Sequence, residues 1–86
     1  MKKWFVYILR CNDGTLYTGV TTNIQRRLHE HNKTSRGSKY TKARRPVNLV
    51  YKAVYNTRSA AQKAEYQIKQ LTRVQKERLI NDKMVI

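Results

Sequence analysis

The chain has 86 residues, of which 19 are Lys or Arg and 5 are Asp or Glu, so its formal net charge is +14 at pH 7. This length predicts one domain spanning residues 1–86 and excludes a large multidomain enzyme. Hydrophobic residues make up 40% of the chain, which is enough for a small core and too many for a low-complexity tail. The charge favours nucleic acid as the partner, ahead of an anionic membrane surface.

Cysteine content and the apolar start of the chain restrict the cellular compartment in which we expect the protein. Cys11 is the only cysteine, so no internal disulfide forms, and one Cys with two His cannot complete a four-ligand zinc site. We therefore expect no zinc and a reducing, cytoplasmic location. The apolar run at the start ends at Arg10, too early for a signal peptide. No segment approaches the ~20 apolar residues that cross a bilayer, so we expect no membrane partner.

Two apolar, β-branched segments open the chain. Residues 4–10 and 16–21 have this character, and the turn residues Asn12, Asp13 and Gly14 lie between them. The pattern predicts two strands joined in a β-hairpin.

The length of this turn decides where two tyrosines point. A three-residue turn with Gly14 in the left-handed conformation places Tyr7 opposite Gly19 and diagonally from Tyr17 on one face. A two-residue turn would place the tyrosines on opposite faces. An ordinary aromatic core pair explains the first arrangement as well as a functional pair does.

A helix follows the hairpin. Asn23 predicts its N-cap, and residues 24–32 have helical apolar spacing. At about 100° per residue, Arg27 and His31 lie on the apolar side of this helix. A buried histidine with satisfied hydrogen bonds, beside an arginine whose stem crosses the apolar stripe, explains this placement without a function.

The middle of the chain is strongly basic. Residues 33–45 combine Ser, Thr and Gly with six basic residues and no apolar periodicity, which predicts a loop. Pro46 suits the start of a strand, and residues 47–55 predict the third strand. A solvated surface explains any single lysine here, but the run as a whole favours contact with phosphates and a stacked base. The expected nucleic-acid contacts are Lys33, Arg36, Lys39, Tyr40, Lys42, Arg44 and Arg45.

Two helices complete the predicted order ββαβαα. Thr57 or Ser59 caps a helix that extends to about residue 71, and a short helix covers residues 74–80. Glu65 lies on the side of the first of these helices that faces the sheet. A carboxylate there needs a partner, and either an ion pair with a nearby arginine or a divalent cation meets that need.

An ordered set of these residues resembles the motif set of the GIY-YIG nuclease domain. The set consists of Tyr7 in Phe5-Val6-Tyr7, Tyr17 in Tyr17-Thr18-Gly19, then Arg27, His31 and Glu65. The resemblance covers nearly the whole chain and is closest to the small stand-alone bacterial members, which are usually described as uncharacterised. Each short motif is weakly specific, whereas the ordered combination with correct spacing is strongly specific.

The resemblance implies a fold, an activity and residue roles. The implied α+β fold has a three-stranded antiparallel sheet flanked by helices, and the implied activity is metal-dependent cleavage of a DNA phosphodiester bond. Tyr7 and Tyr17 would be the paired active-site tyrosines, Arg27 the catalytic arginine, His31 an auxiliary residue and Glu65 the metal ligand. One Mg²⁺ or Mn²⁺ ion is then expected, because so few acids cannot easily form a two-metal site.

The hypothesis assigns a task to each side chain. Tyr7 is the general base or holds the attacking water, and the first role requires a lowered pKa. Arg27 contacts the non-bridging oxygens, and Tyr17 orients phosphate or water. The two tyrosines are interchangeable in these roles. His31 relays a proton or bonds the phosphate.

The sequence departs from the family pattern at three positions. Phe5 stands where the family name expects Gly, and Thr18 replaces Ile, which are backbone or core variants. Val20 occupies a position where some members have an active-site lysine. One cation fewer then reaches the phosphate, unless Lys39 or Lys42 compensates.

We therefore predict an endonuclease of DNA repair or processing, guided by DNA structure more than by sequence, that acts as a monomer and prefers DNA to RNA. The alternative is a non-catalytic nucleic-acid-binding module on the same scaffold. A third hypothesis is a basic partner of ribosomes or of an acidic protein, although no RNA-recognition motif is present. Cleavage that requires a metal ion distinguishes the first hypothesis from the second.

Overall fold

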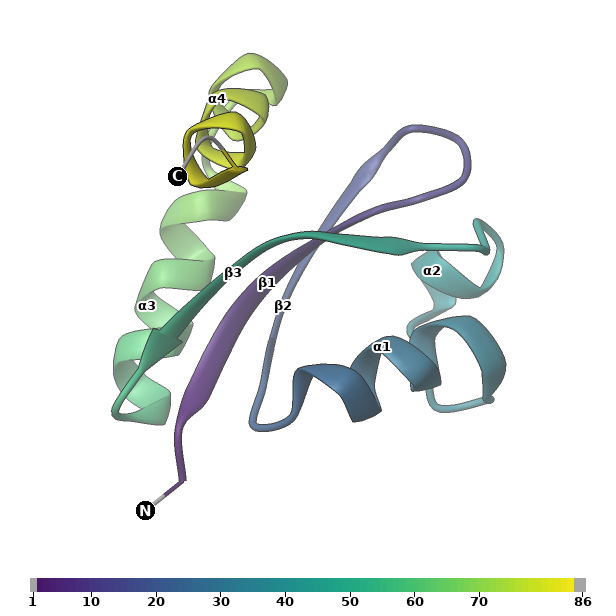
Figure 1. Ribbon diagram of the computed structural model, residues 1–86, viewed down its shortest axis with the longest axis horizontal. Helices are drawn as coiled ribbons and strands as arrows, with labels where there is room; N and C mark the ends of the chain where they lie inside the picture. The colour runs from purple at the N-terminus through teal and green to yellow at the C-terminus, as the bar shows by residue number, and fades with distance from the viewer. Residues whose placement is uncertain (1, 85–86) are drawn as a thin grey trace.

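The computed structural model describes residues 2–84 of the chain (Figure 1). Its elements confirm the predicted ββαβαα order, with one short helix added between the second strand and the third. They are β1 (Trp4–Arg10), β2 (Leu16–Thr21), α1 (Ile24–Lys33), α2 (Lys39–Lys42), β3 (Asn48–Tyr55), α3 (Arg58–Lys69) and α4 (Arg73–Met84).

The three strands form one antiparallel sheet in the order β2-β1-β3, so β1 is central and β2 lies at an edge. The hairpin has the three-residue turn, because the Cys11 N–H donates to the Thr15 carbonyl at 2.8 Å and Gly14 has a φ of 84°. Tyr7 is therefore paired with Gly19, as predicted. The turn chemistry fixes which residues of β1 face each side of the sheet.

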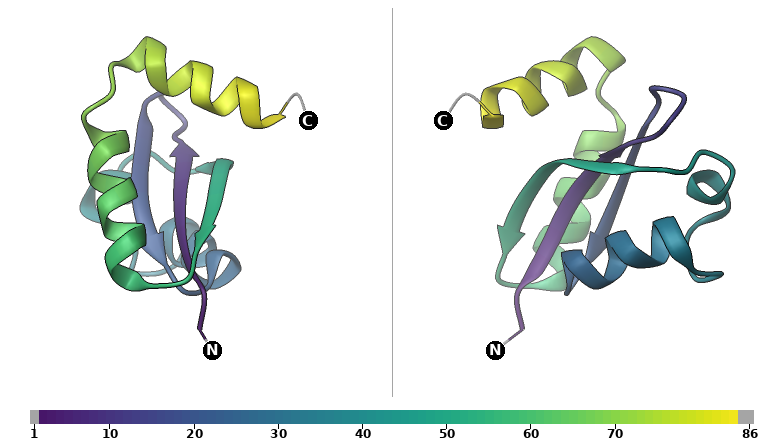
Figure 2. Two further views of the ribbon diagram at one scale, coloured as in Figure 1. Left: turned by 90° about the vertical axis from the view of Figure 1, so that its left-hand side faces the viewer. Right: turned by 45° about the vertical axis from the view of Figure 1, so that its right-hand side comes forward.

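Helices cover both faces of the sheet: α3 and α4 lie on one side, and α1 and α2 on the other (Figures 1 and 2). On the first side, Val6 and Ile8 belong to a buried cluster with Ala61 and Ile68 of α3 and Ile80 of α4. Because successive residues of a strand point to opposite faces, their neighbours in β1 belong to the other layer.

The second buried cluster lies between the sheet and α1. It contains Tyr7 and Leu9 of β1 together with Val47, and the half-buried Ile24 and Leu28 of α1 pack against it. Tyr7 is thus part of the hydrophobic core on the side that carries α1. Its position is set by core packing as well as by the strand register.

Local side-chain contacts set the ends of two helices. The Asn23 side chain accepts a hydrogen bond from the Arg26 N–H at 2.9 Å, which confirms the predicted N-cap of α1. At α3 the Thr57 hydroxyl accepts from the Ala60 N–H at 3.1 Å, so Thr57 is the cap and Ser59 lies inside the helix.

The last helix, expected over residues 74–80, is longer and spans Arg73–Met84. Two other boundaries also differ from the prediction. Residues 33–45 are not all loop, because Ser38 caps the short helix α2 and Thr41 within it is fully buried. The third strand begins at Asn48, after Val47, because the Asn32 side chain binds both backbone polar groups of Val47, at 2.8 and 3.0 Å. Both differences come from contacts between segments distant in sequence.

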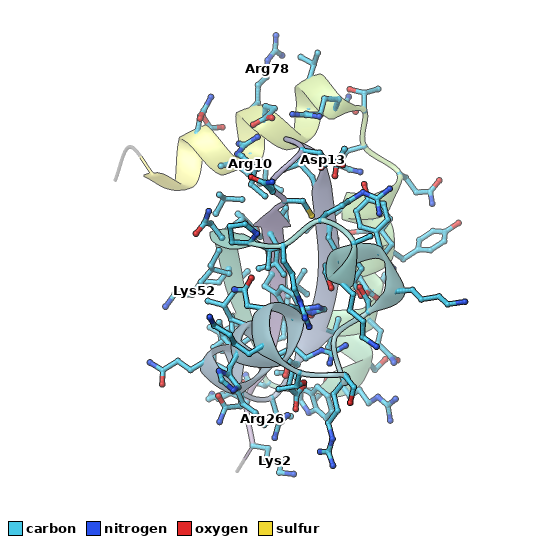
Figure 3. All side chains as sticks on the ribbon, turned by 90° about the vertical axis from the view of Figure 1, so that its right-hand side faces the viewer. Lys2, Arg10, Asp13, Arg26, Lys52 and Arg78 are labelled. Atoms are coloured by element: carbon cyan, nitrogen blue, oxygen red, sulfur yellow. The ribbon has the colours of Figure 1, made fainter. Side chains whose placement is uncertain are left out.

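The hairpin turn is tied to both helical layers (Figure 3). Arg10 forms a two-pronged ion pair with Glu77 of α4, at 2.8 and 2.7 Å, and Arg73 donates to the Gly14 carbonyl at 2.7 Å. On the other side, Asp13 accepts from Arg44 at 3.0 Å. The turn therefore connects the two layers at this end of the sheet.

None of the helices within residues 2–84 has the length and apolar character that a membrane span requires.

Candidate active site

A hollow of about 250 Å³ opens beside the edge strand β2, where the two helical layers approach each other. Most of the predicted catalytic and metal-binding residues line it. This tyrosine pocket is lined by Trp4, Tyr7, Tyr17, Gly19, Val20, Arg27, Arg58, Gln62 and Glu65. Since liquid water occupies about 30 Å³ per molecule, the volume is sufficient for a phosphate group with several waters.

Glycine at position 19 gives Tyr7 its place in the pocket. A Cβ atom at this position would lie 2.6 Å from Cζ of Tyr7 and would overlap its hydroxyl group. The Tyr7 ring therefore lies across the backbone of β2, with its centroid 6.5 Å from that of Tyr17. The predicted diagonal pair is present, and it depends on the missing side chain.

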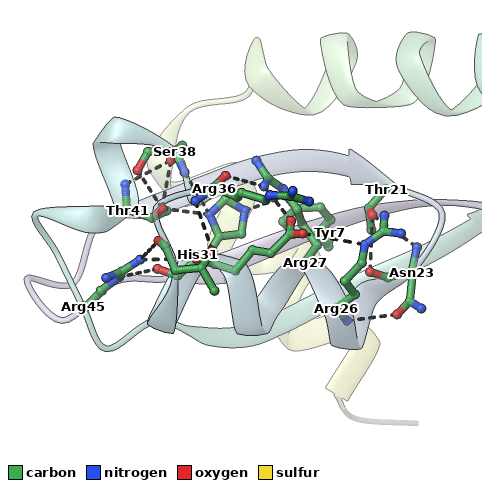
Figure 4. A network of polar contacts seen from close by, with 12 residues as sticks. Tyr7, Thr21, Asn23, Arg26, Arg27, His31, Arg36, Ser38, Thr41 and Arg45 are labelled. Carbon is green, nitrogen blue, oxygen red and sulfur yellow. Dashed lines mark hydrogen bonds and ion pairs between the residues drawn. The ribbon is translucent and has the colours of Figure 1, made fainter.

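His31 does not line the pocket but lies behind Tyr7 (Figure 4). Its side chain is 0% exposed, its Nε2 lies 2.9 Å from the Tyr7 hydroxyl, and its Nδ1 lies 2.8 Å from the Thr41 hydroxyl. Burial, together with the nearby Arg27, lowers the pKa of His31 to about 4. The imidazole is a neutral, fully hydrogen-bonded core residue that also contacts the tyrosine of the pocket.

The hydrogen-bond partners allow two directions for this chain of contacts. In one tautomer, Nδ1 accepts from the Ser38 N–H at 3.5 Å. In the other, His31 Nδ1–H donates to Thr41, whose hydroxyl donates to the Ser38 carbonyl at 3.1 Å. Nε2 then accepts from the Tyr7 O–H, which leaves lone pairs of the phenol oxygen for groups in the pocket.

The pKa of Tyr7 differs from the lowered value that a general base would need. Burial, followed by the neighbouring Tyr17, raises it to about 12, and the nearby Arg27 offsets only part of that increase. Tyr7 therefore holds its proton at neutral pH. Its hydroxyl group can donate to His31 and accept from a water molecule at the same time.

Arg27 is held in position from two sides. Its Nη1 donates to the Glu30 carboxylate at 2.9 Å and to the Arg36 carbonyl at 2.7 Å (Figure 4). Its side chain is 26% exposed. The same pairing lowers the pKa of Glu30. Arg27 therefore presents an oriented guanidinium whose charge is partly compensated within the protein.

Helix α3 forms the opposite wall of the pocket. Arg58, Gln62 and Glu65 line it at helical spacings of four and three residues. The Glu65 carboxylate lies 3.4 Å from Lys69 Nζ, so its partner is a lysine, not the expected arginine. The spacing before Glu65 is the sequence signal that would have indicated Gln62 and Arg58 as site residues.

Among the residues that the structure describes, Glu65 supplies the one carboxylate that lines the pocket. Within residues 2–84, apart from side chains 83 and 84, no cluster of three His, Cys, Asp or Glu residues could hold a metal ion. Mg²⁺ is often bound through one or two carboxylates, waters and a substrate phosphate. The donor set around Glu65 fits an ion held jointly with a phosphate and does not fit an ion held by the protein alone.

Four of the basic residues expected to contact nucleic acid are exposed. They are Lys33 at the end of α1, Arg36 in the following loop, and Lys39 and Lys42 of α2. They lie on the α1–α2 side of the molecule. Other cations, including Lys52 of β3 and Arg78 of α4, lie on other sides (Figure 3). The positive charge is thus distributed over several sides of the fold (Figure 3).

Arg45 has a different environment. Its guanidinium donates to the backbone carbonyls of His31 at 2.6 Å and Glu30 at 3.2 Å, and also to that of Thr34. These carbonyls belong to the last turn of α1 and to its C-cap residue Thr34, so Arg45 caps this helix. Its Nε and Nη2 donors are occupied inside the protein.

Arg44 and Tyr40 are paired with each other. The Arg44 guanidinium carbon lies 3.8 Å from the centroid of the Tyr40 ring, and its Nε donates to Asp13. The Tyr40 ring stacks beside Tyr17 with centroids 6.1 Å apart, and the residue is 36% exposed. Tyr40 therefore lies next to the tyrosine pocket, as a stacking residue would.

Comparison with protein families and known proteins gives consistent matches. A model of the GIY-YIG catalytic domain matches residues 3–78. A UPF0213 protein of Desulfotalea psychrophila is 57% identical over 77 residues, which cover 90% of this chain and 70% of that protein. A UPF0213 protein of Staphylococcus epidermidis is 52% identical over 82 residues, or 95% of this chain and 99% of that protein.

Two solved structures have the same fold. The solution NMR structure of a protein from E. faecalis has a TM-score of 0.67 at 43% identity, over 100% of this chain and 91% of that chain. The solution NMR structure of a UPF0213 protein from Bacillus halodurans has a TM-score of 0.60 at 40% identity, over 92% and 83%. These likenesses support the sheet order and the helical layers described above.

Proposed function

The chain belongs to the GIY-YIG family, with UPF0213 proteins among its relatives, and on this premise we propose that it is a metal-dependent DNA endonuclease that hydrolyses phosphodiester bonds. We propose further that DNA structure, more than base sequence, guides cleavage. Repair or processing of DNA would be its setting. The supporting observation is a single pocket lined by two phenol groups, two guanidinium groups and a carboxylate.

Arg27 is the phosphate-binding group of the proposal. Phosphodiester hydrolysis accumulates negative charge on the non-bridging oxygens in the transition state, and fixed donors stabilise that charge. Arg27 is already oriented by Glu30 and the Arg36 carbonyl, so little reorganisation is needed when phosphate binds. Arg58 of α3 supplies a second guanidinium to the pocket. It stands in for the cation that Val20 does not provide.

Tyr7 holds the attacking water in this proposal. Its O–H is donated to His31, so its oxygen accepts a hydrogen bond from the water and fixes the direction of attack. A pKa of about 12 supports this orienting role over that of a general base. Tyr17, on the same wall, orients the phosphate.

Glu65 is the proposed ligand of one divalent ion, Mg²⁺ or Mn²⁺, with waters and the substrate phosphate completing the coordination. When bound, such an ion supplies Lewis-acid stabilisation of the phosphate. Glu65 exchanges its ion pair with Lys69 for this contact, which frees the lysine ammonium for the DNA backbone.

A non-catalytic nucleic-acid-binding module remains the second candidate, because a specific observation favours it. Arg27 and Glu65, the two charged groups of the proposed chemistry, are each paired within the protein. A scaffold that binds DNA without cutting it would retain these pairs.

The decisive experiment compares cleavage by the wild type and by Glu65→Gln on end-labelled linear, nicked and four-way-branched DNA, in Mg²⁺, Mn²⁺ and EDTA. Asp82→Asn is a matched control, because it removes the same charge from an exposed position of α4. We expect metal-dependent cleavage by the wild type and the control, with loss in Glu65→Gln. Equal binding by all three proteins with no cleavage of any substrate would establish the binding module.

A further inference from the structure

A second hollow, also of about 250 Å³, lies beside β2 next to the tyrosine pocket, and the proposed chemistry does not use it. It brings together the strand β2 and helices from both helical layers. Its lining residues are Leu16, Tyr17 and Thr18 of β2, Tyr40 of α2, Lys69 of α3 and Lys76 of α4. Aromatic and aliphatic surface is thus combined with two ammonium groups, a composition that suits a flat apolar ligand attached to negative charge.

The two hollows adjoin each other along β2. Tyr17 lines both of them. Lys69 lines the second hollow, and its ammonium lies 3.4 Å from the carboxylate of Glu65, which lines the first. A ligand long enough to leave the tyrosine pocket along the strand would therefore enter the second hollow directly.

Tyr40 is held in place before any ligand arrives. The Arg44 guanidinium lies 3.8 Å from its ring centroid, and Arg44 Nη1 also donates to the Tyr40 carbonyl at 2.9 Å. Asp13 holds the other side of this guanidinium at 3.0 Å. A ring fixed in this way loses little conformational entropy on binding, so stacking on it is efficient.

We propose that the second hollow binds one unpaired nucleobase of the nucleic-acid strand whose phosphate occupies the tyrosine pocket. The proposal builds on the proposed function, because it names the class of substrate that the same site accepts. Aromatic side chains stack on any base, and lysines contact the adjoining phosphates without reading sequence. The net charge of +14 favours a polyanion over an apolar protein segment as the occupant.

The inference predicts a preference among DNA structures. Bases within a duplex are already stacked on their neighbours, so a side chain reaches a base face only where a base is unpaired. Single strands, flaps and the unpaired positions of branched DNA therefore fit the two hollows together. An intact duplex fits the tyrosine pocket alone.

Binding in EDTA tests the proposal without requiring cleavage. The probes are a fluorescein-labelled thymidine decamer and a decamer of the same charge made of abasic sites, with affinity read from anisotropy. We expect the wild type to bind the thymidine decamer about tenfold more tightly, since a stacked base contributes that order of affinity. Tyr40→Ala should lose this advantage while its affinity for the abasic decamer stays within about twofold.

Two further variants separate stacking from a general effect on folding. Tyr40→Phe keeps the ring and should retain the preference for bases. Tyr66→Ala removes a tyrosine that is 66% exposed on α3 and lines neither hollow, so it should bind as the wild type does. A tryptophan introduced by Tyr40→Trp should show fluorescence quenching, relative to the wild type, with the thymidine decamer and not with the abasic one.

The proposal is overturned if the wild type binds both decamers equally, if Tyr40→Ala weakens both to the same extent, or if neither decamer binds. The first two outcomes would indicate phosphate contacts alone, and the third would point to a partner other than nucleic acid. Absence of cleavage combined with a base preference would refute the endonuclease and leave the base-binding site in place.

Discussion

The two walls of the tyrosine pocket are built in different ways. On one side, Tyr7 is 3% exposed and joins His31 and Thr41 in a buried chain of hydrogen bonds. On the other, Arg58 and Gln62 of α3 are exposed, and Glu65 forms an ion pair with Lys69. The first wall is part of the core, and the second is a polar helix face. Function and stability are therefore coupled in the first wall and separable in the second.

Replacement of His31 is the strongest test of this contrast. His31→Ala leaves a cavity and removes the partner of two buried hydroxyls, so we expect the free energy of unfolding to fall by about 3 kcal/mol. Urea denaturation followed by circular dichroism measures this loss. His29→Ala, an exposed position of the same helix, should change stability by less than about 0.5 kcal/mol. Equal effects of the two variants would contradict a core role for His31.

Acidic pH should lower the stability of the folded protein through His31, which belongs to the same wall. The pKa of His31 is about 4 in the folded protein, against 6.5 as its ordinary value, so between these pH values the unfolded chain binds more protons. Stability is full above pH 6.5 and falls by about 3 kcal/mol as the pH drops toward 4.

His31→Gln, which has no titrating ring, provides the control for this pH effect. Its stability should be nearly flat across the same interval, and the melting temperature as a function of pH gives the comparison. Arg10 lowers the pKa of Glu77 to about 2, so the loss of the Arg10–Glu77 pair belongs to a lower range, from 4.5 downward. A wild type that keeps its full stability down to pH 4.5 would argue against a neutral buried imidazole.

Substitutions in the wall that α3 forms should change activity and leave stability unchanged. Arg58→Ala removes a guanidinium from the pocket, and we expect the rate of DNA cleavage to fall by about 10- to 100-fold, since a charged hydrogen bond contributes about 1.5–3 kcal/mol. The free energy of unfolding should stay within about 0.5 kcal/mol of the wild type. Lys63→Ala, at an exposed position of α3 outside the pocket, is the matched control. An Arg58→Ala variant that loses stability instead would remove the contrast between the walls.

Two basic residues that are close in sequence should give smaller effects, each on a different property: stability for one and the salt dependence of DNA binding for the other. Arg45→Ala removes the cap on α1 and should lower stability by about 1–2 kcal/mol without changing the salt dependence of DNA binding. Lys42→Ala should leave stability unchanged and reduce the slope of log affinity against log salt by about 1. Affinity titrations at several salt concentrations distinguish these outcomes. A reduced slope in Arg45→Ala would mean that its guanidinium reaches phosphate after all.

The sequence was most informative where a short-range rule applies. Two apolar, β-branched segments and the turn residues between them predicted the hairpin, and the three-residue form of the turn was the one predicted to place Tyr7 opposite Gly19. Helical spacing correctly placed Arg27 and His31 on the inward side of α1. These predictions depend on residues within one element or one hairpin, where geometry leaves few alternatives.

Long-range contacts account for what the sequence did not reveal. The basic composition of residues 33–45 gave no sign that Arg45 would cap α1 or that Thr41 would be buried against His31. The raised pKa of Tyr7 likewise results from burial by segments that are distant in the chain. Composition predicts an electrostatic field, whereas the use of each guanidinium is decided by its neighbours in space.

The hairpin turn that joins β1 to β2 also bears on the arrangement of the two hollows. It contacts α4 through Arg73 and Glu77, and it contacts the chain after α2 through Arg44. These contacts join the two helical layers at one end of β2, and residues of both layers line the two hollows. A turn of another length would break these contacts, and a two-residue turn would also place Tyr7 and Tyr17 on opposite faces of the sheet. The length of the turn is thus tied to the arrangement of both hollows, although the turn residues 12–14 line neither of them.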